Sequence, residues 1–266
     1  MGNKTGVLDR TIPESEYSLI EALRSSDLKS FMRSPAYYKW TKDNPNERKF
    51  NETSINIGTA VHCALLEPNE FKHRFMLAKV KTKTCNEWKA SKAIALEQGK
   101  ILLNPDEFRT VELISGKARS QPIIQKILDG ARTEVTAVAK IEGIWCKARA
   151  DILVTQDDGT AIIYDVKTTS KQLDTFKKFA IYDYGYDISA AYYQMIFRAC
   201  KVPVKFFRLI TMETTPAYEA RLFEFSPEKL TRIEGYIAAA LRDYSECLKT
   251  GIFESKNALE EIEIID

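Results

Sequence analysis

Three strand-like segments joined by short turns constrain the fold of this chain more than any other feature of its sequence. They span Glu134 to Ile141, Ile144 to Val154 and Thr160 to Thr168. The first turn is Glu142-Gly143 and the second is Gln156-Asp157-Asp158-Gly159. In both turns glycine supplies the positive φ that a tight hairpin connection needs. The sequence therefore predicts three neighbouring antiparallel strands.

The turns also predict which residues lie opposite one another. The first turn places Glu134 opposite Asp151, and the second places Asp151 opposite Asp165. These three carboxylates would form one row, with opposite Cβ atoms ~4.5–5.5 Å apart. Because such a row repels itself, a divalent cation would stabilise it, and oxygen ligands favour Mg²⁺ or Mn²⁺ over Zn²⁺.

The last of the three strands ends in Asp165-Val166-Lys167. Side chains alternate between the faces of a strand, so Asp165 and Lys167 project together while Val166 points into the core. Charged residues also alternate on ordinary exposed sheets, and an Asp-x-Lys triplet is common by chance. The apolar run Ile162-Ile163-Tyr164 just before it favours a central strand, where exposed charge is less expected. The sequence therefore favours a metal site here over a solvated face.

Three blocks of sequence resemble known nuclease motifs. Asp151 followed by Asp165-Val166-Lys167 resembles the signature of the PD-(D/E)XK nuclease superfamily. The segment Ile57 to Pro68 resembles the "G-T-A-x-H-x-x-L-L-E-P" block of the RecE-type exonuclease (exonuclease VIII) family, and Ser30 to Tyr38 resembles the upstream "S-P-A-x-Y" block of that family. The block around His62 is the most specific of the three, because very divergent nucleases share Asp-x-Lys.

The order of the predicted elements agrees with the fold that this resemblance implies. A helix, three antiparallel strands, a further helix over 187–201 and another strand match the αβββαβ core of restriction-endonuclease-like proteins. We therefore predict an α/β fold, with a mixed sheet flanked by helices, helical elaborations on the N-terminal side and a long C-terminal helix. The predicted domains are an N-terminal arm over 1–26, loosely attached, and a single nuclease domain over 27–266.

The resemblance assigns roles to two further residues. A lone histidine near a helix start is more often structural than a ligand, but the RecE-type block places its histidine at the active site, which implies that His62 binds metal or orients a bound water. In RecB-type relatives a glutamine of the helix after the sheet faces the active site, which Gln194 matches. A tyrosine one turn later is absent, since that position carries Arg198, and an aromatic stripe on a helix is usually core.

These residues predict metal-assisted phosphodiester hydrolysis. Asp151, Asp165 and the Val166 carbonyl, with Glu134 or His62, would hold one or two Mg²⁺ ions. Lys167 would position or deprotonate the attacking water, and its alternative role is an ion pair with Asp165. Some RecB-type relatives hold an iron–sulfur cluster with one upstream cysteine and a C-terminal trio. The five cysteines here are widely spaced and only Cys247 lies near the C-terminus, so no such cluster is expected.

Composition and charge limit the class of protein only broadly. Hydrophobic content of 44% and charged content of 29% describe a soluble globular chain, and no apolar run is long enough to span a bilayer. The start of the chain has no signal peptide pattern, so we expect a cytoplasmic protein of a bacterium or a phage-infected cell. A net charge of +2 does not indicate or exclude nucleic acid, because binding depends on local clusters.

The resemblance implies a DNA exonuclease that digests one strand of linear double-stranded DNA from 5′ to 3′ and leaves 3′ overhangs for recombination. It also implies a homo-oligomeric ring and a RecT-like single-strand annealing protein as partner, often encoded by phages. Phosphate pockets favour arginine with hydroxyls, so Arg33 and Ser34 are candidates for binding a 5′-phosphate. A site-specific or structure-specific endonuclease and a non-catalytic DNA-binding module remain as alternatives.

Overall fold

The structure is a computed structural model that describes residues 5–8, 12–47 and 52–254. Its main sheet has six strands in the order β1-β4-β5-β6-β7-β8. These strands are β1 Gly6–Val7, β4 Ala131–Ile141, β5 Ile144–Thr155, β6 Ala161–Thr169, β7 Val204–Glu213 and β8 Ala220–Glu224. A second, two-stranded parallel sheet consists of β2 Phe75–Leu77 and β3 Ile101–Leu103.

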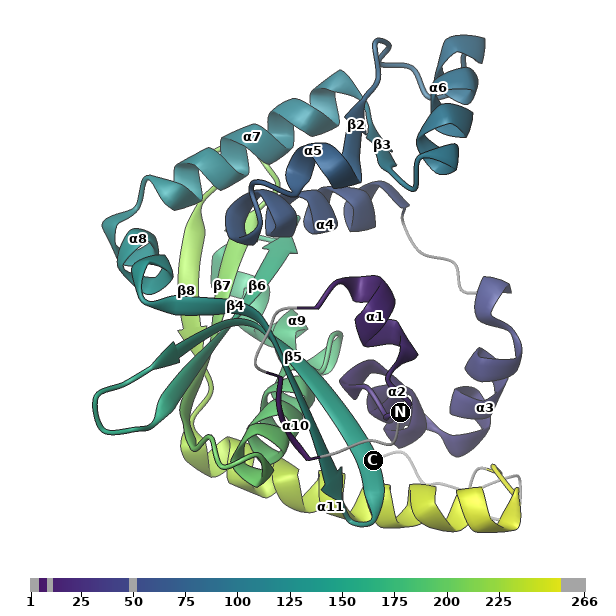
Figure 1. Ribbon diagram of the computed structural model, residues 1–266, viewed down its shortest axis with the longest axis vertical. Helices are drawn as coiled ribbons and strands as arrows, with labels where there is room; N and C mark the ends of the chain where they lie inside the picture. The colour runs from purple at the N-terminus through teal and green to yellow at the C-terminus, as the bar shows by residue number, and fades with distance from the viewer. Residues whose placement is uncertain (1–4, 9–11, 48–51, 255–266) are drawn as a thin grey trace, which may run out of the picture.

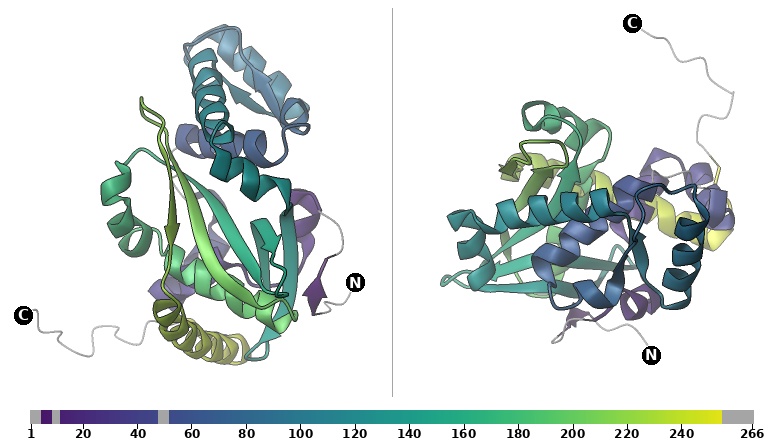
Figure 2. Two further views of the ribbon diagram at one scale, coloured as in Figure 1. Left: turned by 90° about the vertical axis from the view of Figure 1, so that its left-hand side faces the viewer. Right: turned by 90° about the horizontal axis from the view of Figure 1, so that it is seen from above.

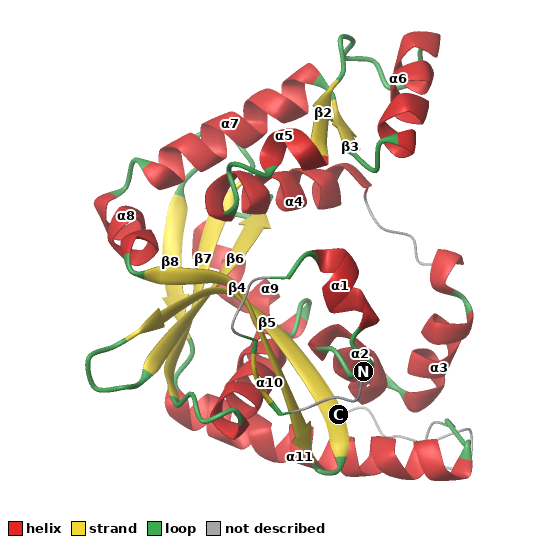
Figure 3. Cartoon of the chain, in the orientation of Figure 1, coloured by secondary structure: helices red, strands yellow, loops and turns green. Residues whose placement is uncertain are grey.

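The helices are α1 Glu14–Leu19, α2 Ser25–Arg33, α3 Pro35–Asp43, η1 Pro45–Glu47, α4 Glu52–Leu66, α5 Phe71–Arg74, α6 Asn86–Glu97, α7 Pro105–Arg119, α8 Pro122–Asp129, α9 Leu173–Tyr182, α10 Tyr186–Ala199 and α11 Pro227–Thr250. No helix in the described ranges is both long enough and apolar enough to cross a membrane. Figure 1 labels these elements, and Figure 3 shows helices surrounding a central sheet.

The predicted meander is present. β4 pairs antiparallel with β5, and β5 pairs antiparallel with β6. Gly143 and Gly159 adopt the positive φ values of 81° and 79° expected of the two turns. β6 then pairs with β7 in parallel, which requires a crossover, and α9 and α10 provide it. The αβββαβ core, the mixed sheet and the C-terminal helix are therefore confirmed.

Helices cover both faces of the sheet (Figures 1 and 2), and a hydrophobic core lies against each face. The core that we call the α10 core lies against α2, α10 and α11 and includes Phe31, Phe197 and Leu241. The α4 core lies against α4, α7 and α8 and includes Val61 and Ile114. Along β6, alternate residues enter opposite cores, with Ile163 in the α10 core and Ile162 and Tyr164 in the α4 core. The sheet is thus the middle layer between two helical layers.

A small lobe extends from the α4 layer. Trp88 of α6 and Leu102 of β3 form a separate buried cluster, which includes Ala78 and Ala95. Figure 2 shows this part of the chain projecting away from the main sheet.

The segment predicted to be a loosely attached arm contains regular structure in its described part. β1 pairs with β4, and Leu23 lies in the α10 core. Lys147 of β5 is only 2% exposed, and its ammonium donates to the carbonyls of Tyr17 and Ile20. These contacts fix α1 beside the sheet. The domain boundary at residue 27 stays a prediction.

Candidate metal centre

Glu134 and Asp151 lie opposite one another on β4 and β5, in the predicted register. Thr133 pairs with Ile152 and Val135 pairs with Ala150 on either side of them. The ladder is interrupted between these pairs because Glu134 has φ 54°, in the left-handed region. The Glu134 side chain is nevertheless almost completely buried, at 3% exposure.

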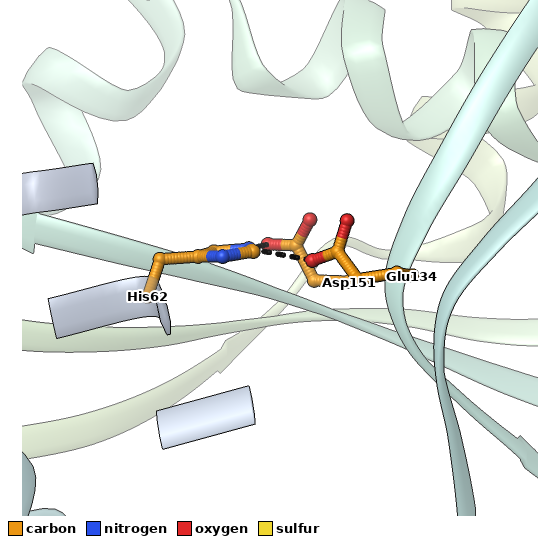
Figure 4. Close-up of side chains that lie close together, drawn as sticks. All are labelled: His62, Glu134 and Asp151. Carbon is orange, nitrogen blue, oxygen red and sulfur yellow. Dashed lines mark ion pairs between the residues drawn. The ribbon is translucent and has the colours of Figure 1, made fainter. Parts of the chain in front are cut away.

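Helix α4 brings His62 to the two carboxylates (Figure 4). The Nε2 atom of His62 lies 3.2 Å from Asp151 Oδ2 and 3.4 Å from Glu134 Oε1. In the sequence, Gly58 precedes a helical pattern with Val61, Ala64 and Leu65 on one face, which predicts a helix that starts after Gly58. The helix begins at Glu52, so this predicted boundary was wrong. Gly58 lies inside the helix, where a Cβ atom would stand 3.1 Å from Thr168 Oγ1 of β6. The glycine therefore permits the close packing of α4 on β6.

Burial and mutual repulsion shape the protonation of this cluster. Burial raises the pKa of Glu134 to about 7, and the Asp151 carboxylate adds to the rise. Burial also opposes a charge on Asp151, but the His62 imidazole, Lys167 and the Val166 N–H outweigh it and lower the pKa of Asp151 to about 2. The pKa of His62 is raised, because the two carboxylates outweigh its burial. The His62 imidazole therefore keeps its positive charge to a higher pH than usual, beside the Glu134 and Asp151 carboxylates, which are largely shielded from water.

The arrangement fits a divalent metal ion. One ligand atom from each of His62, Glu134 and Asp151 lies within 4.8 Å of the others. Glu134 Oε1 is buried and accepts no hydrogen bond from any described residue. An unsatisfied buried carboxylate oxygen costs free energy unless a cation or a donor meets it. Two carboxylates and an imidazole are a donor set that suits several first-row divalent ions and Mg²⁺.

Asp165 and Lys167 project together from β6, as alternation predicts, and form an ion pair. Val166 points into the α4 core between them. Extending the register of β5 and β6 by one residue would place Asp165 opposite Asp151. The last paired residues are Ile152 and Tyr164, however, so these two aspartates are not paired. Instead, the Val166 N–H donates to Asp151 Oδ2 at 2.7 Å, and the Val166 carbonyl accepts from Lys167 Nζ at 3.3 Å. The third predicted carboxylate is thus held by Lys167 rather than by the group around His62.

Sequence reasoning missed Arg149, which clamps Glu134 from the other side. Its Nε donates to Glu134 Oε2 at 2.8 Å, and its Nη2 lies 2.8 Å from Glu14 Oε2 of α1. Arg149 precedes Asp151 by two residues and therefore shares its strand face, which is the signal that could have identified it. The clamp leaves Oε1 of Glu134 directed at His62.

The other predicted site residues are Gln194, Arg33 and Ser34. None of the site's hydrogen bonds or ion pairs among the described residues involves Gln194. The preceding residue, Tyr193, has a pKa raised well above its usual value, mainly by burial and in part by the carboxylates of Asp165 and Asp151. Arg33 lies over the ring of Tyr37 at 4.0 Å, and the Ser34 hydroxyl caps α3 by accepting from the Tyr37 N–H.

A cavity of about 520 Å³ opens onto the cluster. His62, Arg149, Lys167 and Tyr186 line it, together with Glu14. The Lys167 ammonium lies 5.3 Å from the centre of the Tyr186 ring. The Lys167 ammonium, the His62 imidazole and the Arg149 guanidinium therefore face one solvent-accessible space, directly beside the buried carboxylates that contact His62.

The fold and this site define a PD-(D/E)XK-like domain. The chain belongs to the family described as "PDDEXK-like domain of unknown function (DUF3799)", whose profile matches residues 24–264. A comparison with curated proteins gives no match.

A solved structure of a Eubacterium rectale protein named "Putative exonuclease" is similar over 97% of this chain and 96% of its own, with a TM-score of 0.63 and 16% identity. At that identity the similarity concerns the fold alone. A second structure, SSO0001, matches 76% of this chain and 82% of its own with 15% identity and a TM-score of 0.31, too low to support an argument.

Proposed function

We propose that this chain is a metal-dependent deoxyribonuclease that hydrolyses linear double-stranded DNA from its ends. The observation that carries the proposal is the cluster of His62, Glu134 and Asp151 at a cavity that His62 and Lys167 line. Membership of a PDDEXK-like family and the fold of the Eubacterium rectale protein, which is named an exonuclease, support it.

Some residues of the site would bind the metal ion, and others would position the metal ligands and the Lys167 ammonium. Asp151, Glu134 and His62 would hold Mg²⁺ or Mn²⁺, and Asp165 and the Val166 carbonyl stand next to them as the further oxygen ligands proposed for this site. When bound, the ion lowers the pKa of a coordinated water and neutralises phosphate charge. Arg149 keeps the Glu134 carboxylate in place through the 2.8 Å ion pair. Asp165 holds the Lys167 ammonium at the cavity wall, where it can orient the nucleophile and stabilise developing negative charge.

We further propose the 5′ to 3′ polarity, the homo-oligomeric ring and the RecT-like annealing partner that the RecE-type resemblance implies. The supporting residues are the block around His62, which lies on α4 beside the carboxylates, and the Ser30 to Tyr38 block, which forms the end of α2 and the start of α3. Arg33 lies in a cleft that meets the site and is the proposed 5′-phosphate contact. Ser34 already caps α3, so its hydroxyl is a weaker candidate than Arg33.

Two kinds of substrate test this proposal. One is linear duplex DNA labelled at either the 5′ or the 3′ end, and the other is covalently closed circular duplex DNA. We expect digestion of linear DNA in Mg²⁺ or Mn²⁺, early release of the 5′ label, sparing of the closed circle and no activity in EDTA. Full activity in EDTA would refute the metal site. Cleavage of the closed circle would favour the endonuclease alternative.

Two matched lysine variants test whether the activity depends on the proposed site or on surface lysines in general. Lys167→Ala should abolish digestion, whereas Lys126→Ala, at an exposed lysine of α8, should leave it unchanged. If both variants digest linear DNA at the parent rate, the active-site assignment is wrong.

A further inference from the structure

A second and larger cleft meets the metal centre at Tyr186. It has a volume of about 1120 Å³, and Tyr186 lines both this cleft and the cavity over the metal centre. This volume exceeds the roughly 300–1,000 Å³ of ordinary small-molecule sites. The cleft therefore suits a section of a polymer that continues into the site.

Two pairs of aromatic rings line this cleft. On α3, Tyr37 and Trp40 are stacked, with ring centres 6.1 Å apart and planes 23° from parallel. On the turn before α10, the rings of Tyr184 and Tyr186 are 5.3 Å apart at 32°. Gly185 between them has φ 56°, and a Cβ atom there would lie 3.1 Å from the Lys29 side chain. Glycine thus permits a turn that presents both tyrosines at the cleft.

One ring of each pair is exposed, whereas Tyr37 and Tyr186 are half-buried. Trp40 is 41% exposed and Tyr184 is 39% exposed, although large aromatic side chains normally bury most of their surface. Exposed aromatic rings that line an open cleft are typical of surfaces on which bases stack.

A basic side chain accompanies each ring pair. The Arg33 guanidinium lies 4.0 Å from the centre of the Tyr37 ring, and the Lys29 ammonium lies 5.8 Å from that of Tyr186. Arginine and lysine beside aromatic rings combine a phosphate contact with a stacking surface. Glu47 and Asp183 also line the cleft, so its net charge is close to zero and stacking must supply most of the affinity.

We propose that this cleft binds an unpaired segment of a DNA strand, with bases on Trp40 and Tyr184 and phosphates near Arg33 and Lys29. The assignment deepens the proposed function and rests on it for the choice of DNA. A double helix would hide its base faces from both ring pairs, so the strand that reaches Lys167 past Tyr186 is single. Stacking is tolerant of sequence, because every base has a π-face.

Binding in EDTA tests this proposal without any cleavage. The probes are a fluorescein-labelled oligothymidylate and a blunt hairpin duplex of the same label. We expect the parent to bind the single strand more tightly than the duplex, and Trp40→Ala or Tyr184→Ala to weaken single-strand binding about tenfold. Tyr236→Ala is the matched control, because Tyr236 is 60% exposed on α11 and does not line the cleft.

Tryptophan fluorescence gives an independent readout. Of the three tryptophans, Trp88 is buried, and Trp145 is half-buried and lines a different cavity. Trp40 is exposed in the cleft, so stacking of a base there should quench part of the emission of the parent. Trp40→Phe should retain most of the affinity, because a ring remains, and lose most of the quenching. Circular dichroism of each variant confirms that it is folded.

The outcomes separate this proposal from the proposed function. If Trp40→Ala, Tyr184→Ala and Tyr236→Ala all bind the oligonucleotide like the parent, the cleft does not hold a strand, even if linear duplex is digested. If the duplex is never digested but the two cleft variants lose binding, the strand site stands and the nuclease assignment fails. Tighter binding of the duplex hairpin than of the single strand, in the parent and in all variants, would also overturn the proposal.

Discussion

Removing Arg149 should destabilise the metal-free protein in a way that depends on pH. Glu134 has a pKa of about 7 in the folded chain, above its ordinary value of 4.5. A raised carboxyl pKa contributes stability that is fully present below the unfolded value and is lost as the pH rises through 7. The Arg149 guanidinium limits that loss, because it favours the ionised carboxylate. Arg149→Met therefore matters most where Glu134 is ionised.

The structure sets the expected size. Glu134 is buried and the Arg149 side chain is 22% exposed, so the pair is mostly shielded from water. Removing one partner of a buried pair costs about 3–5 kcal/mol, and the partial exposure favours the lower end. We expect a loss of about 3 kcal/mol in the free energy of unfolding near about pH 8.5. Near about pH 5.5 Glu134 is protonated, and the lost hydrogen bonds should cost about 1 kcal/mol.

Urea unfolding followed by circular dichroism in EDTA measures this difference. The Glu134→Gln background is the control, because a neutral amide there needs no counter-charge and Arg149→Met should cost about 1 kcal/mol at both pH values. A loss in Arg149→Met that is equal at both pH values, and equal in the Glu134→Gln background, would refute the reasoning.

Three further predictions follow from the same structure. Lys167→Ala should lower the rate of linear duplex digestion by at least about 10³-fold while keeping the circular dichroism spectrum of the parent. Arg33→Ala should weaken the preference of the enzyme for duplex with a 5′-phosphate over duplex with a 5′-hydroxyl, and a preference that is unchanged in this variant would place the phosphate pocket elsewhere. Burial and the nearby Lys167 lower the pKa of Lys29 to about 8, so oligonucleotide affinity should fall as the pH rises through about 8. Lys29→Arg should remove that fall, because arginine stays charged, and an identical pH profile in parent and variant would contradict this assignment.

The sequence was sufficient to predict the three-stranded meander of the sheet and the opposite positions of Glu134 and Asp151, but not strand β1. Both follow from local information, because a turn of fixed length sets the register of the strands that it joins. The alternation that turns Val166 inward and pairs Asp165 with Lys167 is equally local. Predictions of this kind hold because they need no knowledge of what packs above the sheet.

The parts of the site that could not be predicted from the sequence depend on contacts between distant segments of the chain. Arg149 meets Glu14 only because Lys147 anchors α1 beside β5. The cleft forms where the turn at Gly185 meets Lys29 of α2, more than 150 residues earlier in the chain. The start of α4 was placed too late because a glycine usually ends a helix pattern, whereas Gly58 serves the packing of α4 on β6. Propensity and periodicity carry no information about such contacts.

The left-handed conformation of Glu134 explains how the two faces of the sheet meet at the site. Residues that are an even number of positions apart share one face of a regular strand. In β4, however, Ala131 packs with the α4 core and Val135 packs with the α10 core. In β5, Ala150 packs with the α10 core and Ile152 with the α4 core, so the faces also exchange across Asp151.

This exchange lets His62 approach the carboxylates from α4 while Tyr186 and Lys29 approach the neighbouring strand from the other helical layer. A residue with a side chain in this conformation costs about 1–2 kcal/mol, which glycine would avoid. Glycine, however, cannot supply a carboxylate. The chain therefore keeps a strained backbone at the one position where the strain directs an otherwise unsatisfied oxygen at His62, which is the arrangement expected of a residue retained for binding rather than for stability.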